Sequence, residues 1–242
     1  MISIIILTYN RLDVLKRCIN SIVLSNYKDY EIIVINNASS DGTQEYLMSQ
    51  KNIITISNIS NEGVIARNKG FGIAKGNIIF QVDDDATIFP NALERIDNYF
   101  IKDEIGAIGQ DASYFDGWLG FKRPVPIDGY ADFITGYIWA FRNNLKFRYD
   151  DNLKPFWREE SCLQINIKYD GLNIVHCEPL GSHSSRRTTI DHDLLTKNTK
   201  YVIDKWKPLI DNLYKDDIQF FNGCSVEEYK TKYLNSKEII IG

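Results

Sequence analysis

The sequence has few of the features that mark several protein classes. Its four cysteines form no CxxC pair, which favours a reducing, cytoplasmic setting. The longest apolar runs, 4–7 and 32–35, are strand-sized, far short of the roughly 18 residues that a bilayer span requires. Lys and Arg number 28 against 32 Asp and Glu, giving a net charge of −4. General nucleic-acid binding is therefore not expected, because such binders normally show a basic excess.

The overall composition indicates a packed globular protein. Of 242 residues, 44% are hydrophobic, 12% aromatic and 25% charged, which argues against a disordered or collagen-like chain. One large domain is the simplest expectation at this length. The sequence opens on Met1 without a charged, cleavable leader, so we expect a cytoplasmic protein and leave peripheral contact with the inner face of a membrane open.

Strand-like and helical patterns alternate along the first hundred residues. Residues 3–8, 31–35, 53–56 and 78–82 resemble strands, and apolar residues recur at helical spacing between 12 and 23. Helices are also predicted at 63–74 and from Pro90 onward. This alternation predicts an α/β fold with a mainly parallel central sheet and helices on both faces.

The later residues give a looser pattern. Further strands are predicted at 132–141 and 172–176, and helices at 191–206 and 226–234. Residues 111–130 mix aromatic side chains with glycine and proline, so we interpret them as a shaped loop over a cleft.

Polar clusters follow four of the predicted strands, at 8–11, 36–37, 58–61 and 83–85. Ligands of open α/β sheets bind at the carboxyl ends of the strands. The sharpest cluster is Asp83, Asp84 and Asp85, where crowded like charges favour a compensating cation. Carboxylate oxygens suit Mg²⁺ or Mn²⁺ bridging to phosphate. The alternative is a set of acidic residues that simply precedes a helix.

Four motifs resemble family 2 glycosyltransferases with the GT-A fold, in order and spacing. They are IIILTYNR (4–11), VINNASSDGT (34–43), NEGVIARNKGFGIAKG (61–76) and FQVDDDATIFP (80–90), with a weaker likeness continuing to about residue 185. The resemblance implies a GT-A-like catalytic domain over 1–185, with a nucleotide-sugar part at 1–110 and an acceptor and catalytic part at 111–185. Residues 186–242 are then a C-terminal helical extension.

The resemblance also implies roles for individual residues. The expected donor contacts are Thr8, Tyr9, Arg11, Asn36, Asp41, Arg67, Asp83 and Asp84. Asp85, His183 and Asp83 are the implied ligands of Mn²⁺ or Mg²⁺. Trp118, Trp139 and Gly136 are assigned to the acceptor side, with core packing as the alternative for Trp139.

Two positions depart from the family pattern. Asn36 stands where the family usually carries aspartate, which makes the preferred base less certain. The segment 159–163 reads EESCL, so Glu160 stands where an aspartate is usual. Our hypothesis is that Glu160 is the general base, with Glu159 as the second candidate. The alternative for both residues is a solvated charge pair.

The sequence thus predicts an inverting, metal-dependent transfer from a nucleotide-diphosphate sugar, with UDP-sugar as the expected donor. The acceptor is expected to be a glycan, a lipid-linked molecule or a protein, and the C-terminal helices offer a surface for homo-oligomer formation. Two alternatives remain at this point: a sugar nucleotidyltransferase, and a nucleotide- or glycan-binding module without turnover.

Overall fold

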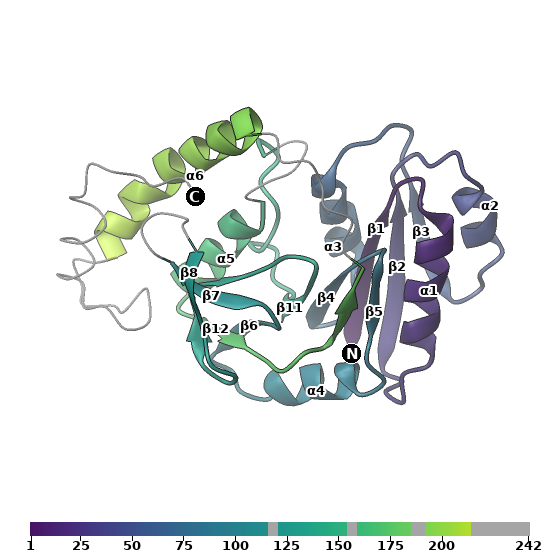
Figure 1. The fold of residues 1–242 in the computed structure, drawn as a ribbon, viewed down its shortest axis with the longest axis horizontal. Helices are drawn as coiled ribbons and strands as arrows, with labels where there is room; N and C mark the ends of the chain where they lie inside the picture. Colours follow the sequence, from purple (N-terminus) through teal and green to yellow (C-terminus); the bar gives the residue numbers. More distant parts are fainter. Residues whose placement is uncertain (116–120, 154–158, 185–191, 214–242) are drawn as a thin grey trace.

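The computed structural model describes residues 1–115, 121–153, 159–184 and 192–213. Its centre is an eight-stranded sheet in the order β3-β2-β1-β4-β11-β6-β12-β9 (Figure 1). The four strands β3, β2, β1 and β4 are mutually parallel, and β11 runs antiparallel to both β4 and β6. The expectation of an α/β fold with a mainly parallel sheet is confirmed.

The first half of the chain builds the parallel part of the sheet. Its strands are β1 (Ile2–Thr8), β2 (Tyr30–Asn36), β3 (Ile53–Ser57), β4 (Ile78–Asp83) and the short β5 (Ala86–Ile88). Its helices are α1 (Leu12–Val23), α2 (Thr43–Met48), the 3-10 turn η1 (Val64–Ala66), α3 (Arg67–Ile73) and α4 (Ala92–Tyr99). Each of the four strands predicted here is present.

The second half completes the sheet and adds two small ones. Its strands are β6 (Ile105–Gly109), β7 (Ala112–Phe115), β8 (Phe121–Pro124), β9 (Tyr130–Ala131), β10 (Phe133–Ile134), β11 (Ile138–Arg142), β12 (Asn173–His176) and β13 (Gly181–His183). Its helices are α5 (Glu159–Tyr169) and α6 (His192–Leu213). β10, β7 and β8 form a three-stranded sheet, and β13 pairs with β5.

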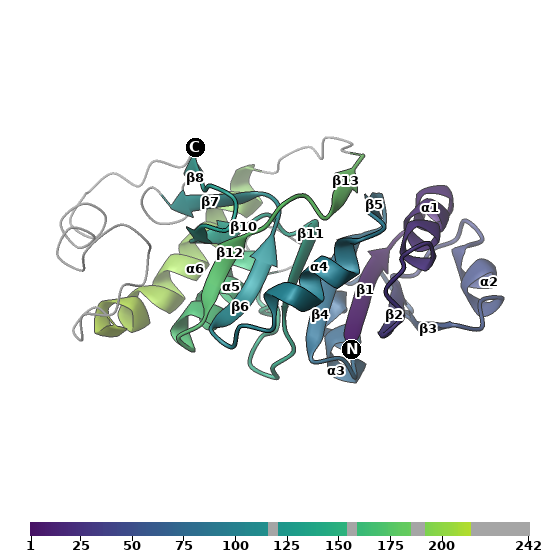
Figure 2. The same ribbon diagram turned by 90° about the horizontal axis from the view of Figure 1, so that it is seen from below.

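Two hydrophobic clusters cover the two faces of the sheet. Alternate strand residues point to opposite faces, so Ile4 and Ile6 join one cluster whereas Ile5 joins the other. The first cluster packs beneath α1, α2 and α4, and the second beneath α3 and α5. Helix α3 comes close to the sheet at Gly70, where a Cβ would lie 2.9 Å from Ile35. Figure 2 shows the strands of this sheet side by side across the molecule, from β12 to β3, with α4 in front of them.

Several predicted elements are wrong in detail. Residues 111–130 are not one loop, because β7 and β8 form a hairpin whose short strands are obscured by glycine and proline in the sequence. The strand predicted at 132–141 is broken at 135–137, and β10 and β11 belong to different sheets. The helix predicted at 63–74 starts as a 3-10 turn, and α6 continues beyond 206 to Leu213. The helix predicted at 226–234 lies outside the described residues.

Helix α6 packs against α5, on the side away from the β1–β4 half (Figure 1). Within the described ranges, none of the helices has the length and apolar character needed to cross a bilayer.

Candidate active site

The acidic triplet lies where β4 ends and the chain turns into β5. The strand ends at Asp83, and Asp84 and Asp85 lie in the turn that follows it. Asp84 points inward and is 4% exposed. Asp83 and Asp85 both approach His183 instead. The three carboxylates therefore have two different environments.

Asp84 joins β4 to the residues that follow β1. The Thr8 hydroxyl donates to Asp84 Oδ2 at 2.8 Å, and Arg11 Nη1 donates to Asp84 Oδ1 at 2.8 Å. Burial raises the pKa of Asp84, and these two hydrogen bonds act against that rise. Arg11 also reaches Asp85 Oδ2 at 3.1 Å. Asp84 thus holds Thr8 and Arg11 in place, and both of its oxygens are used within the protein.

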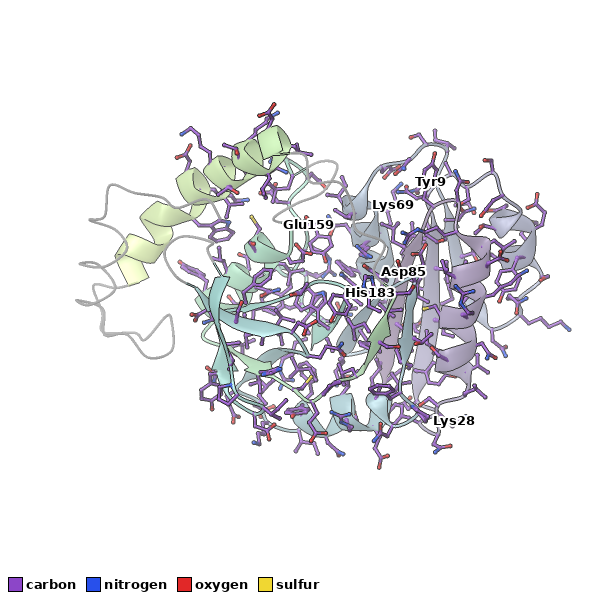
Figure 3. All side chains as sticks on the ribbon, viewed as in Figure 1. Tyr9, Lys28, Lys69, Asp85, Glu159 and His183 are labelled. Carbon is purple, nitrogen blue, oxygen red and sulfur yellow. The ribbon has the colours of Figure 1, made fainter. Side chains whose placement is uncertain are left out.

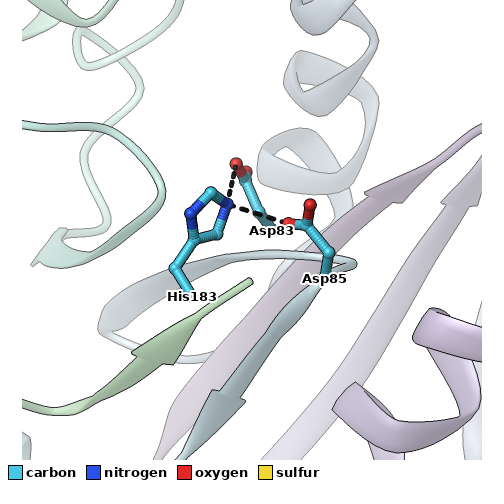
Figure 4. Close-up of side chains that lie close together, drawn as sticks. All are labelled: Asp83, Asp85 and His183. Atoms are coloured by element: carbon cyan, nitrogen blue, oxygen red, sulfur yellow. Dashed lines mark ion pairs between the residues drawn. The ribbon is translucent and has the colours of Figure 1, made fainter. Parts of the chain in front are cut away.

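Asp85 and His183 meet because of strand register. His183 pairs with Ala86 across the antiparallel β13 and β5, which brings its ring beside the preceding Asp85. His183 Nε2 lies 2.9 Å from Asp85 Oδ1 and 3.9 Å from Asp83 Oδ2 (Figure 4). One ligand atom from each of the three residues lies within 4.8 Å of the others.

These three residues fit a divalent cation. Asp85 Oδ1 is buried and has no hydrogen-bond partner, although His183 Nε2 is nearby. A buried carboxylate oxygen without a partner is costly, and a shared cation would satisfy both that oxygen and the imidazole lone pair. Two carboxylates and one imidazole are ligands that Mn²⁺ accepts well, whereas Mg²⁺ prefers oxygen ligands.

Arg67 balances the first carboxylate of the triplet. It starts α3 and is 6% exposed, and its Nη2 lies 2.5 Å from Asp83 Oδ1. Burial lowers the pKa of Arg67, but the charges of Asp83, Glu159 and Glu160 act together in the opposite direction and the net pKa is raised. The Nε atom of Arg67 is buried without a partner. Arg67 also lines the cleft between the two halves of the chain.

A cleft of about 550 Å³ connects the two halves of the chain. Its lining comes from strand ends in the first half and from the β10–β11 connection and the start of α5 in the second: Leu7, Tyr9, Arg11, Asn37, Asn61, Gly63, Val64, Arg67, Asp83, Asp84, Thr135, Gly136, Tyr137, Glu159 and Glu160. Figure 3 shows Glu159 and the Asp85–His183 pair in the middle of the molecule, between the halves. Five of the eight residues predicted for donor binding therefore share one cleft with Glu159 and Glu160: Tyr9, Arg11, Arg67, Asp83 and Asp84.

Glu159 and Glu160 form the first turn of α5 and differ in burial. Glu159 is 5% exposed and its Oε2 has no hydrogen-bond partner. Burial, followed by the negative charge of Glu160, raises the pKa of Glu159 well above its usual value. Glu160 is half-buried. The pair thus combines a buried carboxyl group whose ionised form is disfavoured with a more accessible one.

The β10–β11 connection lies directly against the Glu160 side chain. A Cβ built on Gly136 would lie 2.3 Å from Glu160 Oε1, so only glycine leaves room for this carboxylate. Gln81, from β4, donates to the Gly136 carbonyl and accepts from the Tyr149 hydroxyl. Because Gln81 is buried, these hydrogen bonds fix the backbone on which Glu160 rests.

Two residues predicted to contact the donor have partners within the protein. Asn36 is 2% exposed; its amide donates to Gln44, and its oxygen accepts from the Ser39 amide. Both polar ends of Asn36 therefore have partners within the loop after β2, and the contact with a base stays a prediction. Asp41 accepts from the Leu12 amide at 2.9 Å, capping the start of α1 from another loop. Partial burial would raise the pKa of Asp41, but hydrogen bonds from the Thr43 hydroxyl and the Leu12 amide lower it.

The structure describes two of the three residues assigned to the acceptor side, Trp139 and Gly136. Trp139 is 0% exposed and stacks on Phe141 at 4.6 Å, so it belongs to the core and does not line a binding surface. Its strand β11 is covered on both faces, which explains the burial. Gly136 does line the cleft. Trp118 lies outside the described residues.

Sequence reasoning missed several residues that line the cleft, among them Asn37 and Tyr137. Asn37 lines the cleft, and its side chain accepts from the Glu62 amide and donates to Asn61 Oδ1. Tyr137 lines the same cleft and packs against the His183 ring, with ring centroids 4.6 Å apart. Asn37 stood in a polar cluster at a strand end, which was a usable signal. Tyr137 carried none, because its neighbour His183 is remote in sequence.

The sequence is similar to known glycosyltransferases over its first two thirds. The family model described as glycosyl transferase family 2 matches residues 3–159. An uncharacterized glycosyltransferase of Haemophilus influenzae is 34% identical over 145 residues, which are 57% of this chain and 43% of that protein. A poly(ribitol-phosphate) beta-glucosyltransferase of Bacillus spizizenii is 35% identical over 106 residues, 40% of this chain and 17% of that protein. The chain thus spans less than half the length of these relatives.

Solved structures share the fold at low sequence identity. Residues 1–349 of TarS from S. aureus, in complex with UDP-GlcNAc, match with a TM-score of 0.61 and 15% identity, covering 77% of this chain and 59% of that one. The mannosyltransferase PcManGT from Pyrobaculum calidifontis, in complex with GDP-Man and Mn²⁺, matches with a TM-score of 0.61 and 16% identity, covering 95% and 67%. The GT-A fold and the family match over 157 of 242 residues agree, and the chain belongs to glycosyl transferase family 2.

Proposed function

We propose that the protein transfers a sugar, with inversion, from a nucleotide-diphosphate donor to an acceptor hydroxyl in glycan or polysaccharide synthesis. One observation carries the proposal: a single cleft joins the residues after β1 and β4 to the carboxyl pair at the start of α5. Inversion requires the acceptor to attack from the side of the sugar opposite the leaving nucleotide. A cleft with charged groups from both halves of the chain supplies that arrangement.

The donor is proposed to lie along the β1–β4 edge. Tyr9, Arg11 and Arg67 line the cleft there, and the guanidinium groups suit phosphate oxygens. A UDP-sugar is the first donor to test, since TarS binds UDP-GlcNAc in one of the similar structures. GDP-mannose is the second, since PcManGT was solved with GDP-Man. Asn36 is turned inward, so no base preference is drawn from it.

Asp83, Asp85 and His183 would hold the divalent cation, Mn²⁺ or Mg²⁺. When bound, such a cation supplies positive charge that stabilises the departing diphosphate. The orphaned Oδ1 of Asp85 supports this assignment. Arg67 would add a second positive charge beside Asp83, on the cleft side of the triplet.

Glu160 is proposed as the general base. A base must be ionised and within reach of the acceptor hydroxyl, and the raised pKa of the buried Glu159 disfavours that residue. As the acceptor oxygen bonds to the anomeric carbon, the bond from that carbon to the diphosphate oxygen breaks. The hydroxyl proton passes to Glu160, and the nucleoside diphosphate leaves with the bonding electron pair.

A donor panel tests the proposal. The protein is incubated with Mn²⁺ or Mg²⁺, UDP-, GDP- or dTDP-sugars, and glycan, lipid-linked or protein acceptors. Release of nucleoside diphosphate together with a glycosylated acceptor supports transfer. Pyrophosphate released from a nucleoside triphosphate and a sugar phosphate would indicate a nucleotidyltransferase, and donor binding without any product would indicate a silent binding module.

A further inference from the structure

Helix α6 lies beyond the residues that match the family, yet it packs onto the helix that carries Glu160. The family match ends at residue 159, and α6 spans His192–Leu213. One face of α6 is buried, with Asn198, Thr199, Val202 and Trp206 each at most 5% exposed. This i, i+4, i+8 spacing places the buried side chains in one stripe along the helix.

The first attachment of α6 is to α5 itself. The indole Nε1 of Trp206 donates to the Cys162 sulfur at 3.2 Å, and both side chains are buried. Cys162 is two residues after Glu160 in the same helix. Burial raises the pKa of this thiol to about 12, so the sulfur accepts the hydrogen bond as a neutral thiol. The α6 contact therefore acts on the turn that bears the proposed base.

The second attachment reaches the chain segment below the cleft. Asp150 accepts from Lys205 Nζ at 2.5 Å and from the Tyr201 hydroxyl at 2.8 Å. Its side chain is 8% exposed. Burial alone would raise the pKa of Asp150, but the hydrogen bond from Lys205 and further hydrogen bonds lower it to about 2, so the pair is ionised at neutral pH.

Asp150 adjoins the network that supports Gly136. The preceding residue, Tyr149, exchanges two hydrogen bonds of 2.8 Å with Asn68, and its hydroxyl donates to Gln81. Gln81 in turn holds the Gly136 carbonyl. One attachment of α6 is therefore to the helix that carries Glu160. The other is to Asp150, which adjoins the hydrogen bonds that hold Gly136 against Glu160.

We propose that α6 positions the general base, with Trp206, Lys205 and Tyr201 as its positioning residues. The inference rests on the proposed function, since it concerns the placement of Glu160. These residues line no part of the described cleft. They act through α5 and the Asp150 segment, and a displacement of about 1 Å in a catalytic group costs roughly 100-fold in rate.

The test compares Trp206→Phe/Lys205→Met with Lys200→Met. Lys200 is on the same helix and pairs with Asp204 at 2.9 Å, and both side chains are well exposed. In the double variant we expect kcat for UDP release from the most active UDP-sugar to fall at least tenfold. The Kd of UDP with Mn²⁺, measured by calorimetry, should change less than twofold, because none of the residues proposed to bind the nucleotide or the cation belongs to α5 or α6. Lys200→Met should match the wild type in both.

Two further variants keep the test sharp if the double variant does not fold. Tyr201→Phe removes one hydroxyl and should lower kcat in the same direction, and Lys205→Arg should retain wild-type kcat because it keeps the ion pair. Hydrogen exchange gives a readout without turnover: amides in the first turns of α5 should exchange faster in Tyr201→Phe, whereas those of β1 and β4 should not.

The proposal would be overturned by an unchanged kcat in the double variant and Tyr201→Phe, or by an equal loss in Lys200→Met. An equal loss of UDP affinity and kcat would also overturn it, since that pattern indicates general destabilisation. A wild-type protein that turns over no donor of the panel contradicts the proposed function instead, so the two failures are distinguishable.

Discussion

Gly136 and Glu160 lie so close together that a methyl group on Gly136 would come within 2.3 Å of Glu160 Oε1 and 2.4 Å of its Cγ. Gly136 belongs to the connection between β10 and β11, whereas Glu160 opens α5. The absence of a side chain at one position therefore sets where the carboxylate of the other can lie.

Gly136→Ala should displace the Glu160 carboxylate and lower kcat by about 100-fold while leaving the Kd of UDP within about twofold. The matched control is Gly72→Ala, because a Cβ there meets nothing within 4 Å. Steady-state kinetics and calorimetry on both variants check this. A wild-type kcat in Gly136→Ala would show that the carboxylate position is not critical.

Glu160→Gln should lower kcat by about 100- to 10,000-fold, the usual contribution of a general base, with donor affinity retained. Glu159→Gln should lower kcat much less, because burial and the charge of Glu160 raise the pKa of Glu159 and disfavour its ionised form. Rapid-quench measurement of one turnover separates the chemical step from product release. The reverse ranking of the two variants would assign the base to Glu159.

The raised pKa of Glu159 makes a prediction about stability and pH. Above the ordinary value of 4.5, the unfolded chain releases this proton while the native protein retains it. The contribution of Glu159 to the free energy of unfolding should therefore fall as pH rises, until the native pKa is reached. In thermal melts from pH 5 to 8, the melting temperature of Glu159→Gln should rise relative to that of the wild type as the pH increases. Parallel melting curves would contradict the assignment.

Asp85→Asn and His183→Ala should each weaken Mn²⁺ binding by at least about tenfold, since even residues that only orient metal ligands contribute 10- to 100-fold. Electron paramagnetic resonance of free Mn²⁺ measures this without any turnover. Glu94→Gln, an exposed acidic residue of α4, is the control. If both site variants titrate like the control, the cation binds elsewhere.

Thr8→Val should destabilise the fold without removing the cation site. It leaves Asp84 Oδ2 without its hydroxyl donor, and an unsatisfied buried acceptor costs about 1–3 kcal/mol. Urea unfolding should show this loss, whereas Mn²⁺ affinity should change less than about threefold. The control is Thr87→Val, which removes an exposed hydrogen bond with the Ser182 hydroxyl. It should lower the free energy of unfolding by less than Thr8→Val does. A large loss of Mn²⁺ affinity in Thr8→Val would make Asp84 part of the cation site.

The strand and helix order was predictable because apolar periodicity reports directly on burial. The gathering of polar residues at one edge of the sheet was predictable for a different reason: parallel strands end at the same edge. The roles of Asn36 and Asp41 were not predictable. Both residues sit in the right loop, but their hydrogen-bond partners decide what they do, and Leu12 is 29 residues from Asp41.

Packing between residues remote in sequence also decides the placement of Trp139, the acidic triplet and the glutamate pair. Whether Trp139 lines a site or packs in the core depends on what covers β11 on each side, which no local pattern reports. Asp84 differs from its two neighbours in its partners: it bonds to Thr8 and Arg11, whereas Asp83 and Asp85 approach His183. The difference in burial between Glu159 and Glu160 required the packing of α5 on the sheet.

The reversed strand β11 has a mechanical consequence. It forms a ladder with β4 on one side and with β6 on the other, so one unbroken sheet spans both halves of the cleft. The amide of Asp83 donates to the carbonyl of Tyr137 at 2.8 Å, extending that ladder into the site itself. The two walls cannot hinge apart as separate lobes without breaking backbone hydrogen bonds. Opening and closing around a substrate must therefore come from side chains and from the connections between strands.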